Sequence, residues 1–146
     1  MNKVFFRAEE LSLPSWTKAA GIFIRRVLDI LGCKNWEVSV LFCSNKYIKT
    51  LNTQYRNKDK ATDILSFPQG LEGPGGQYLA GDIVISLDAL EENVSFFKVS
   101  ADEELRRLLI HGILHLYGYD HATNNKGEPM LKLQEEILAG AGGKIV

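Results

Sequence analysis

The amino-acid sequence predicts an α+β fold: a single domain over residues 1–146, in which about five helices pack against one small mixed β-sheet. Three observations lead to this prediction. The chain has 146 residues, 45% of them hydrophobic, which suffices for one core without disulfides or a structural metal. Strand patterns are concentrated before residue 87 and helix patterns dominate after it. No internal repeat or linker divides the chain.

The first third of the chain alternates strand and helix patterns. A short apolar run at residues 3–7 predicts a strand. Apolar residues recur at helical spacing over residues 16–31, and Gly32 then fits the end of a helix. Residues 36–42 alternate between two faces and are rich in β-formers, which predicts a second strand. Ser44 is a typical N-cap for the amphipathic helix that follows.

Two further strands are expected before residue 87. Residues 61–67 predict one strand, which stops at Pro68. Because proline lacks an amide donor, this strand end is expected at a sheet edge or outside the sheet. Residues 70–77 are rich in glycine and predict a loop, and residues 78–86 predict a strand with an internal glycine.

The rest of the chain is expected to be helical. Helices are predicted over residues 88–97, 102–117 and 128–139, followed by a frayed tail. Ser100 and Glu103 have the spacing of a capping box at the start of the middle helix. This long helix is therefore the central one of the predicted fold.

Composition and charge exclude several classes of protein. A net charge of -1 is not that of a polybasic chain, so contact with nucleic acid requires a local basic patch. The most apolar long stretch, residues 19–32, is interrupted by charges, and the N-terminus lacks the apolar segment of a secretory signal. We therefore expect no membrane contact. Cys33 and Cys43 form no CxxC pair and resemble small buried hydrophobes, which favours a cytoplasmic location.

All three histidines of the chain lie in one stretch of eleven residues, HGILHLYGYDH. His111 and His115 are four residues apart and therefore share one face of the helix. Gly118 permits the backbone to turn back, which brings His121 to the same point. Three imidazoles leave a fourth tetrahedral position open, as catalytic zinc requires. The sequence thus predicts a zinc site at the end of the central helix, although nickel, copper and iron also bind imidazole.

The histidine spacing matches the metzincin motif HExxHxxGxxH, but its glutamate position is occupied by Gly112. That glutamate is the general base in peptide hydrolysis, and glycine cannot replace it. Two alternatives remain open at this stage. The chain is a metallopeptidase-type hydrolase whose base lies outside the motif, or it is a factor whose main role is binding, in which the metal holds the C-terminal region together. Gly112 argues against the first, and the open fourth position argues against the second.

The same stretch resembles the signature of the YbeY-type rRNA maturation factors, a family of bacterial zinc-dependent endoribonucleases. Other parts of the chain resemble further motifs of that family: Leu51-Asn52, Tyr55-Arg56, Asp59, the segment 62–68 (TDILSFP) and Gly81-Asp82-Ile83. The resemblance implies a hydrolase that cleaves single-stranded ribosomal RNA near the 3′ end of the small-subunit RNA and acts in ribosome quality control. It further implies that Arg56 is catalytic, and that ribosomal RNA and the ribosome or its proteins are the partners.

The implied chemistry is consistent with the residues. Cleavage of a phosphodiester builds negative charge on the phosphoryl oxygens, and the planar guanidinium of Arg56 can bind two of them. The nucleophile is either the neighbouring 2′-hydroxyl of RNA or a water activated by the metal, and neither requires a carboxylate at Gly112. The four lysines near Arg56 form either an RNA-backbone patch or a solvated surface: Lys46, Lys49, Lys58 and Lys60.

Several residues near the histidines allow two interpretations. Asp120 either orients an imidazole or stabilises the turn, and we favour the turn. Asp63 and Asp82 either accept a hydrogen bond from a ligand or Arg56, or end a strand. Tyr117 and Tyr119 either stack on a base or pack around the site, and we favour packing.

Overall fold

The protein is built from four strands, five helices and one short 3₁₀ turn. The computed structural model describes residues 1–146. The elements follow in the order β1 (Lys3–Ala8), α1 (Thr17–Ile30), β2 (Trp36–Cys43), α2 (Asn45–Arg56), β3 (Ile64–Glu72), η1 (Pro74–Gly76), β4 (Tyr78–Ser86), α3 (Leu87–Phe97), α4 (Ala101–Tyr117) and α5 (Pro129–Gly140).

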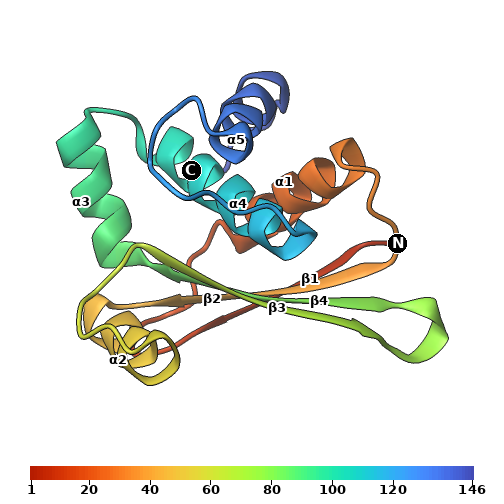
Figure 1. Ribbon diagram of the computed structural model, residues 1–146, viewed down its shortest axis with the longest axis horizontal. Helices are drawn as coiled ribbons and strands as arrows, with labels where there is room; N and C mark the ends of the chain where they lie inside the picture. Colours follow the sequence, from red (N-terminus) through yellow and green to blue (C-terminus); the bar gives the residue numbers. More distant parts are fainter.

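The strands form one mixed sheet in the order β1-β2-β4-β3. β1 and β4 run parallel to β2, whereas β3 runs antiparallel to β4 and forms an edge. Helices α1, α4 and α5 lie above one face of the sheet with α3 at the end of the same layer, and α2 lies against the other face (Figure 1). This arrangement confirms the α+β fold with one small mixed sheet that the sequence predicts.

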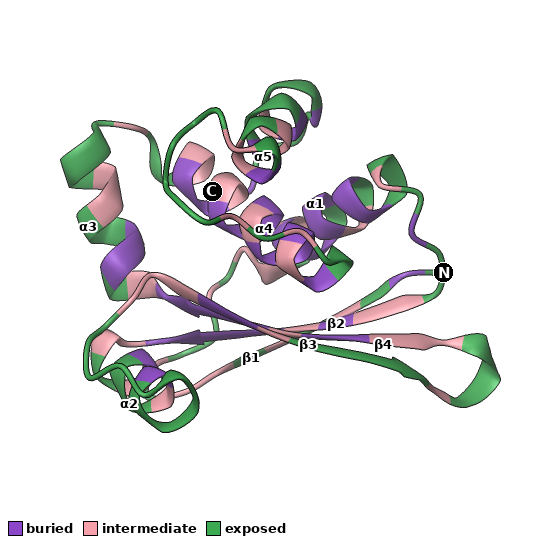
Figure 2. Cartoon of the chain, viewed as in Figure 1, coloured by how far each residue is buried: buried purple, intermediate pink, exposed green.

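The core has two parts because both faces of the sheet are covered. A cluster of 24 buried residues fills the space between the sheet and the main helical layer. A second cluster of 5 buried residues lies between the sheet and α2. Helix α4 runs through the middle of the larger cluster and is mostly buried (Figure 2). The histidine-bearing end of α4 is thus held by packing over the length of the helix.

Two of the predicted helix caps are present. The side chain of Ser44 accepts a hydrogen bond from the backbone N–H of Tyr47 and begins α2. The side chain of Ser100 accepts one from the backbone N–H of Glu103 and begins α4. Each cap satisfies a backbone donor that the first turn of a helix leaves unpaired.

Strand β3 differs from its prediction. It runs through Pro68 to Glu72, and Pro68 pairs with Gly81 of β4, so the predicted strand end at Pro68 is wrong and the predicted loop over residues 70–77 is confined to residues 73–77. Only one side of an edge strand has to pair, and a residue without an N–H fits there. The pairing register shifts between Pro68 and Leu71. The hairpin connection is therefore short and contains only the η1 turn.

The C-terminal tail is ordered, contrary to the predicted fraying. The side chains of Ala141 and Ile145 are buried in the larger core cluster. The backbone N–H groups of Ile145 and Val146 donate to one carboxylate oxygen of Asp102, at 2.6 and 3.0 Å. Burial acts to raise the pKa of Asp102, but these two donors and Arg106 outweigh it and lower the pKa. The tail is thus anchored to the first turn of α4.

The two cysteines are small buried hydrophobes, as predicted. Burial raises the pKa of the Cys33 thiol to about 11 and that of the Cys43 thiol to about 12, and nearby carboxylates add to both effects. Such thiols are protonated and unreactive at neutral pH. The helices are all too short or too polar to cross a bilayer.

Candidate metal centre and its cleft

The end of α4 is shaped by Gly118. Its φ of 118° is left-handed, and its N–H bonds to the carbonyl of His115 at 3.1 Å. The N–H of Tyr119 bonds to the carbonyl of Leu114 at 2.9 Å, which completes a Schellman motif. This motif ends the helix and turns the chain back across its last turn. The predicted role of Gly118 is confirmed.

The turn brings the three histidines together. His111 and His115 lie one helical turn apart on α4, and His121 approaches from the following loop. One ring nitrogen from each lies within 4.8 Å of the corresponding atoms of the other two. The Nε2 atoms of His111 and His115 are 3.1 Å apart. Each ring is partly buried, so the cluster is reachable from solvent.

Each histidine is oriented by an oxygen acceptor at its other nitrogen. The Nδ1 atoms lie 2.7 Å from Gln134 Oε1 for His111, 3.1 Å from the Tyr119 carbonyl for His115, and 2.9 Å from the Thr123 carbonyl for His121. An oxygen acceptor requires the hydrogen on Nδ1, which leaves Nε2 of each ring with a free lone pair. Such contacts to the second nitrogen are the usual support of metal-binding histidines.

The cluster fits a divalent metal such as zinc. Two nitrogens bound to one tetrahedral zinc lie about 3.3 Å apart, close to the 3.1 Å between His111 and His115. Burial lowers the pKa of His111 and of His115, and the neighbouring histidines lower both further. Both rings are therefore neutral at pH 7, the form that binds metals. Two facing lone pairs without a cation between them repel, which also favours a bound ion.

Gly112 has a packing role that its sequence position does not reveal. A Cβ atom at this position would lie 2.9 Å from two atoms of Ile83 and 3.1 Å from Ile64. These contacts are shorter than ordinary carbon–carbon contacts of about 3.5–4.0 Å. The missing side chain therefore lets α4 approach the sheet closely. Any side chain here, a glutamate included, would first meet Ile83 and Ile64 of the sheet.

Arg56 lies in the same cleft as the histidines. It is the last residue of α2, which ends because Asn57 adopts a left-handed conformation with a φ of 57°. Its Nη2 donates to the backbone carbonyl of Ser66 at 3.1 Å. The cleft has a volume of about 880 Å³, and Arg56, His111, His115 and His121 all line it. The structure thus brings together all four residues singled out from the sequence, while their roles stay predictions.

The carboxylates of the cleft already have partners. Asn93 donates a hydrogen bond to Asp63 at 3.1 Å and another to Glu104 at 2.9 Å. Arg107 donates to Glu104 at 2.9 Å and to Glu135 at 3.0 Å. Asp120 accepts a hydrogen bond from the backbone N–H of His121 at 2.8 Å. The bond to Asp120 is local and fits the favoured role in the turn. Asp63 bonds Asn93 rather than Arg56, and Asp82 lies within β4 and outside the cleft lining.

The basic residues are distributed differently from the predicted patch. Of the four lysines near Arg56, only Lys58 lines the cleft. Lys49 instead forms an exposed ion pair with Asp59 at 3.8 Å. Lys126, in the loop after His121, is a further cation of the cleft. The positive charge of the cleft is therefore spread over fewer of these lysines than the sequence suggested, and part of it comes from the C-terminal half.

The two tyrosines near the site pack, as favoured from the sequence. Tyr117 stacks between Trp36 and Tyr119, with ring centroids 6.0 and 5.8 Å away. Neither tyrosine lines the cleft.

Gln134 and Arg107 do line the cleft and were missed by the sequence reasoning. One signal for Gln134 exists: it falls on the buried face of α5, where a polar residue is unusual.

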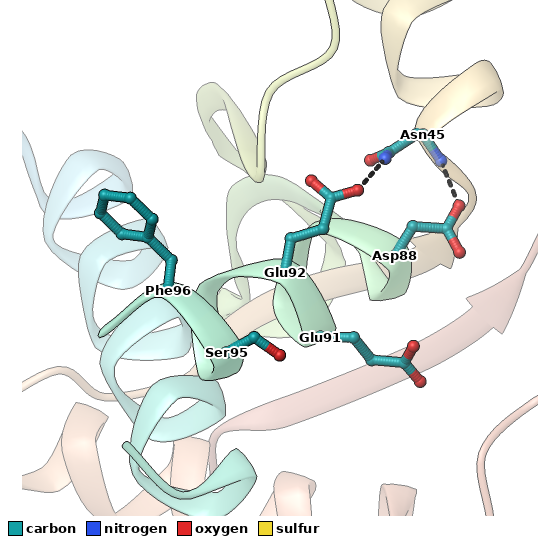
Figure 3. A pocket seen from close by; sticks show the side chains of 6 residues that line it. All are labelled: Asn45, Asp88, Glu91, Glu92, Ser95 and Phe96. Atoms are coloured by element: carbon teal, nitrogen blue, oxygen red, sulfur yellow. Dashed lines mark hydrogen bonds between the residues drawn. The ribbon is translucent and has the colours of Figure 1, made fainter. Parts of the chain in front are cut away.

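A second hollow lies on the far side of α3 and differs in charge. Its lining is Asn45, Asp88, Glu91, Glu92, Ser95 and Phe96, as Figure 3 shows. Asn45 of α2 donates to Asp88 at 2.8 Å and to Glu92 at 2.9 Å, which ties α2 to α3 (Figure 3). Three carboxylates and no cation would repel an RNA backbone. The histidine cleft is therefore the better candidate for a phosphate-binding site.

Comparison with known proteins agrees with this geometry. The family model described as Endoribonuclease YbeY matches residues 5–142. A Treponema denticola protein named Endoribonuclease YbeY is 52% identical over 120 residues, 80% of this chain and 77% of that protein. One of the same name from Treponema pallidum is 44% identical over 143 residues, 95% of this chain and 89% of that protein. The solution structure of TM1509 from Thermotoga maritima matches with a TM-score of 0.64 and 28% identity, covering 97% of this chain and 89% of that one.

Proposed function

Because the chain belongs to the Endoribonuclease YbeY family, we propose that it is a metal-dependent endoribonuclease that cleaves single-stranded ribosomal RNA. In this proposal residues 1–146 act as one catalytic domain, the ion is zinc, and the substrate lies near the 3′ end of the small-subunit RNA. The family further suggests a cytoplasmic role in ribosome quality control, in contact with the ribosome. The observation that carries the proposal is the convergence of three imidazoles and one arginine in a single cleft.

The proposed ligands of the ion are the Nε2 atoms of His111, His115 and His121. Their Nδ1 atoms are all engaged with oxygen acceptors, so Nε2 is the atom that each ring offers. When bound, the ion supplies a Lewis acid that stabilises charge on the phosphoryl oxygens. The nucleophile would be either the neighbouring 2′-hydroxyl of the RNA or a water, and the ion, when bound, would ease loss of its proton, so a carboxylate at position 112 is not required.

Arg56 is the proposed phosphate-binding residue. One donor of its guanidinium is held by the carbonyl of Ser66, which limits the freedom of the exposed side chain. The other donors remain available for two phosphate oxygens, in the forked geometry that arginine prefers. Lys58 and Lys126 add positive charge along the cleft and would attract the RNA backbone. A cleft of about 880 Å³ accommodates a few nucleotides of an unpaired strand.

The alternative of a metallopeptidase-type hydrolase has no support in the cleft. The position of the metzincin glutamate faces Ile83 and Ile64. Each of the four carboxylates of the cleft accepts a hydrogen bond from a neighbouring donor. All four are therefore engaged in bonds within the protein, which argues against a role as the missing general base.

The test is cleavage of a ribosomal RNA fragment that contains both paired and unpaired segments. The zinc-loaded wild type is expected to cut in the unpaired segment, and His115→Ala and a chelator are expected to abolish cutting. Arg56→Ala is expected to lower the rate by about 10²–10³, the range seen when one charge-stabilising donor is removed, with zinc content unchanged. Cleavage by His115→Ala at the same site and rate as by the wild type, in protein freed of contaminating nucleases, would contradict the proposal.

A further inference from the structure

Gln134 is a polar residue on an apolar helix face. Its neighbours on the buried side of α5 are Met130 and Ile137, and Gln134 itself is 7% exposed. Its Oε1 lies 2.7 Å from Nδ1 of His111, which is the shortest of the three contacts to a histidine Nδ1. Burying an amide requires that its hydrogen bonds be made inside the protein. The amide of Gln134 forms its hydrogen bonds with His111 of the candidate metal centre and with Glu135.

The direction of this hydrogen bond is set by Glu135. Nε2 of Gln134 lies 3.2 Å from Oε2 of Glu135, and a carboxylate can only accept. The amide nitrogen therefore faces Glu135 and the amide oxygen faces His111. Because that oxygen can only accept, Nδ1 of His111 must carry the hydrogen. The lone pair of His111 is then on Nε2, beside Nε2 of His115.

Glu135 is itself fixed by Arg107 of α4. Arg107 donates from Nε and Nη2 to the two carboxylate oxygens of Glu135, at 3.0 and 3.2 Å. The same guanidinium also bonds Glu104 at 2.9 Å and Glu103 at 3.2 Å, so its position is well determined. A bidentate arginine keeps the carboxylate ionised and oriented as an acceptor.

The hydrogen-bond acceptor at Nδ1 of His111 differs in kind from those of the other two histidines. His115 and His121 bond backbone carbonyls, which can only accept. A glutamine amide can present either its oxygen or its nitrogen, so a glutamine alone would not define the tautomer of His111. An additional acceptor is needed to hold the amide in one orientation, and Glu135 provides it.

We propose that Gln134 is a positioning residue that holds His111 in its Nδ1–H tautomer, and that Arg107 and Glu135 set the direction of this hydrogen bond. The proposal rests on the proposed function, in which His111 binds the ion through Nε2. It makes α5 a part of the metal centre although α5 contributes no ligand. Loss of a contact of this kind typically weakens metal binding by about 10–100-fold.

The first test measures the tautomer of His111 in the metal-free protein by ¹⁵N NMR of the histidine side chains. The wild type is expected to give the Nδ1–H pattern at His111. Gln134→Met, which keeps the length but removes the acceptor, is expected to give a mixture of both tautomers. Glu135→Ala is expected to give a mixture as well, because the amide can then turn over. Since Glu135 is 46% exposed, this variant leaves the buried face of α5 unchanged.

The second test measures the dissociation constant of zinc, with thermal unfolding of the metal-free proteins alongside. We expect Gln134→Met to bind zinc about 10–100-fold more weakly than the wild type. Gln134→Glu keeps an acceptor and is expected to bind at least as tightly as the wild type. Glu136→Gln is the matched control on the exposed side of α5 and should change neither the tautomer nor the affinity.

The outcomes separate this proposal from the proposed function. If the wild type binds one zinc, His115→Ala does not, and Gln134→Met binds as tightly as the wild type, the role of Gln134 is refuted and the metal site stands. An unchanged Nδ1–H tautomer in both Gln134→Met and Glu135→Ala refutes it as well. A wild type that binds no zinc refutes the proposed function, and this proposal with it.

Discussion

The substitution Gly112→Ala tests whether α4 is held close to the sheet by the absence of a side chain. The added methyl group would lie 2.9 Å from both Cδ1 and Cγ2 of Ile83 and 3.1 Å from Cδ1 of Ile64. Both isoleucines belong to strands under the helix, and Ile83 is fully buried. Ile83 cannot move into solvent to make room, whereas Ile64 is partly buried at the cleft and has more freedom. The substitution therefore overpacks the core at the point where the candidate metal centre begins.

Two opposing effects determine the magnitude. Alanine is favoured over glycine inside a helix by about 0.8–1.0 kcal/mol. Overpacking a well-packed core costs about 1–3 kcal/mol. We therefore expect Gly112→Ala to lower the free energy of unfolding by about 1 kcal/mol, or about 2–4 °C in Tm for a chain of this size. Without the clash, the same substitution would raise the stability.

Urea denaturation followed by circular dichroism measures this difference. Gly140→Ala is the control, because it lies at the end of α5 and its methyl group would meet nothing within 4 Å. This control is expected to be at least as stable as the wild type. Ile83→Val removes Cδ1, so Gly112→Ala should be less destabilising in that background, with a coupling of about 0.5 kcal/mol or more. A Gly112→Ala protein as stable as the wild type, with no coupling to Ile83→Val, would refute the packing argument.

Two further predictions concern the anchored tail and the metal. The lowered pKa of Asp102 means that its stabilising contribution is present above its ordinary value of 3.8 and is lost as the pH falls through the lowered pKa. Asp102→Asn should thus be less stable than the wild type at pH 7, with a Tm difference that shrinks on acidification; a difference independent of pH contradicts this. Zinc at about 100 times its dissociation constant should stabilise the protein by about 2.7 kcal/mol, or about 5–10 °C in Tm. EDTA should reverse the shift and His121→Ala should lack it, and equal shifts in both proteins would contradict the ligand assignment.

The parts of the fold that follow from local rules could be predicted from the sequence. Ser44 and Ser100 mark helix starts because a cap depends on residues only three positions away. The convergence of the histidines follows from helical spacing and from the freedom of Gly118 to turn the chain. The strand through Pro68 was missed because its tolerance for proline depends on being an edge, which sequence spacing does not reveal.

The supporting residues of the site could not be predicted, because they depend on contacts between distant parts of the chain. Gln134 meets His111 across 23 positions, and Arg107 meets Glu135 across 28. No spacing rule connects such pairs, since the angle at which α5 crosses α4 decides which residues meet. Arg56 was identified only through the family resemblance, because its place beside the histidines also depends on how distant parts of the chain meet.

Gly112 shows most clearly how the structure changes the interpretation of the motif. In the sequence, the glycine stands where a peptidase has its base, which suggests a peptidase that lost a residue. In the structure, the same position faces two isoleucines of the sheet, and a carboxylate placed there would be buried without a partner, at a cost of several kcal/mol. Gly112→Glu is thus expected to disrupt the fold rather than create a peptidase. The close packing of α4 on the sheet requires glycine at this position. The packing in turn fixes the distance between α4 and the sheet, and with it the positions of His111 and His115 in the cleft.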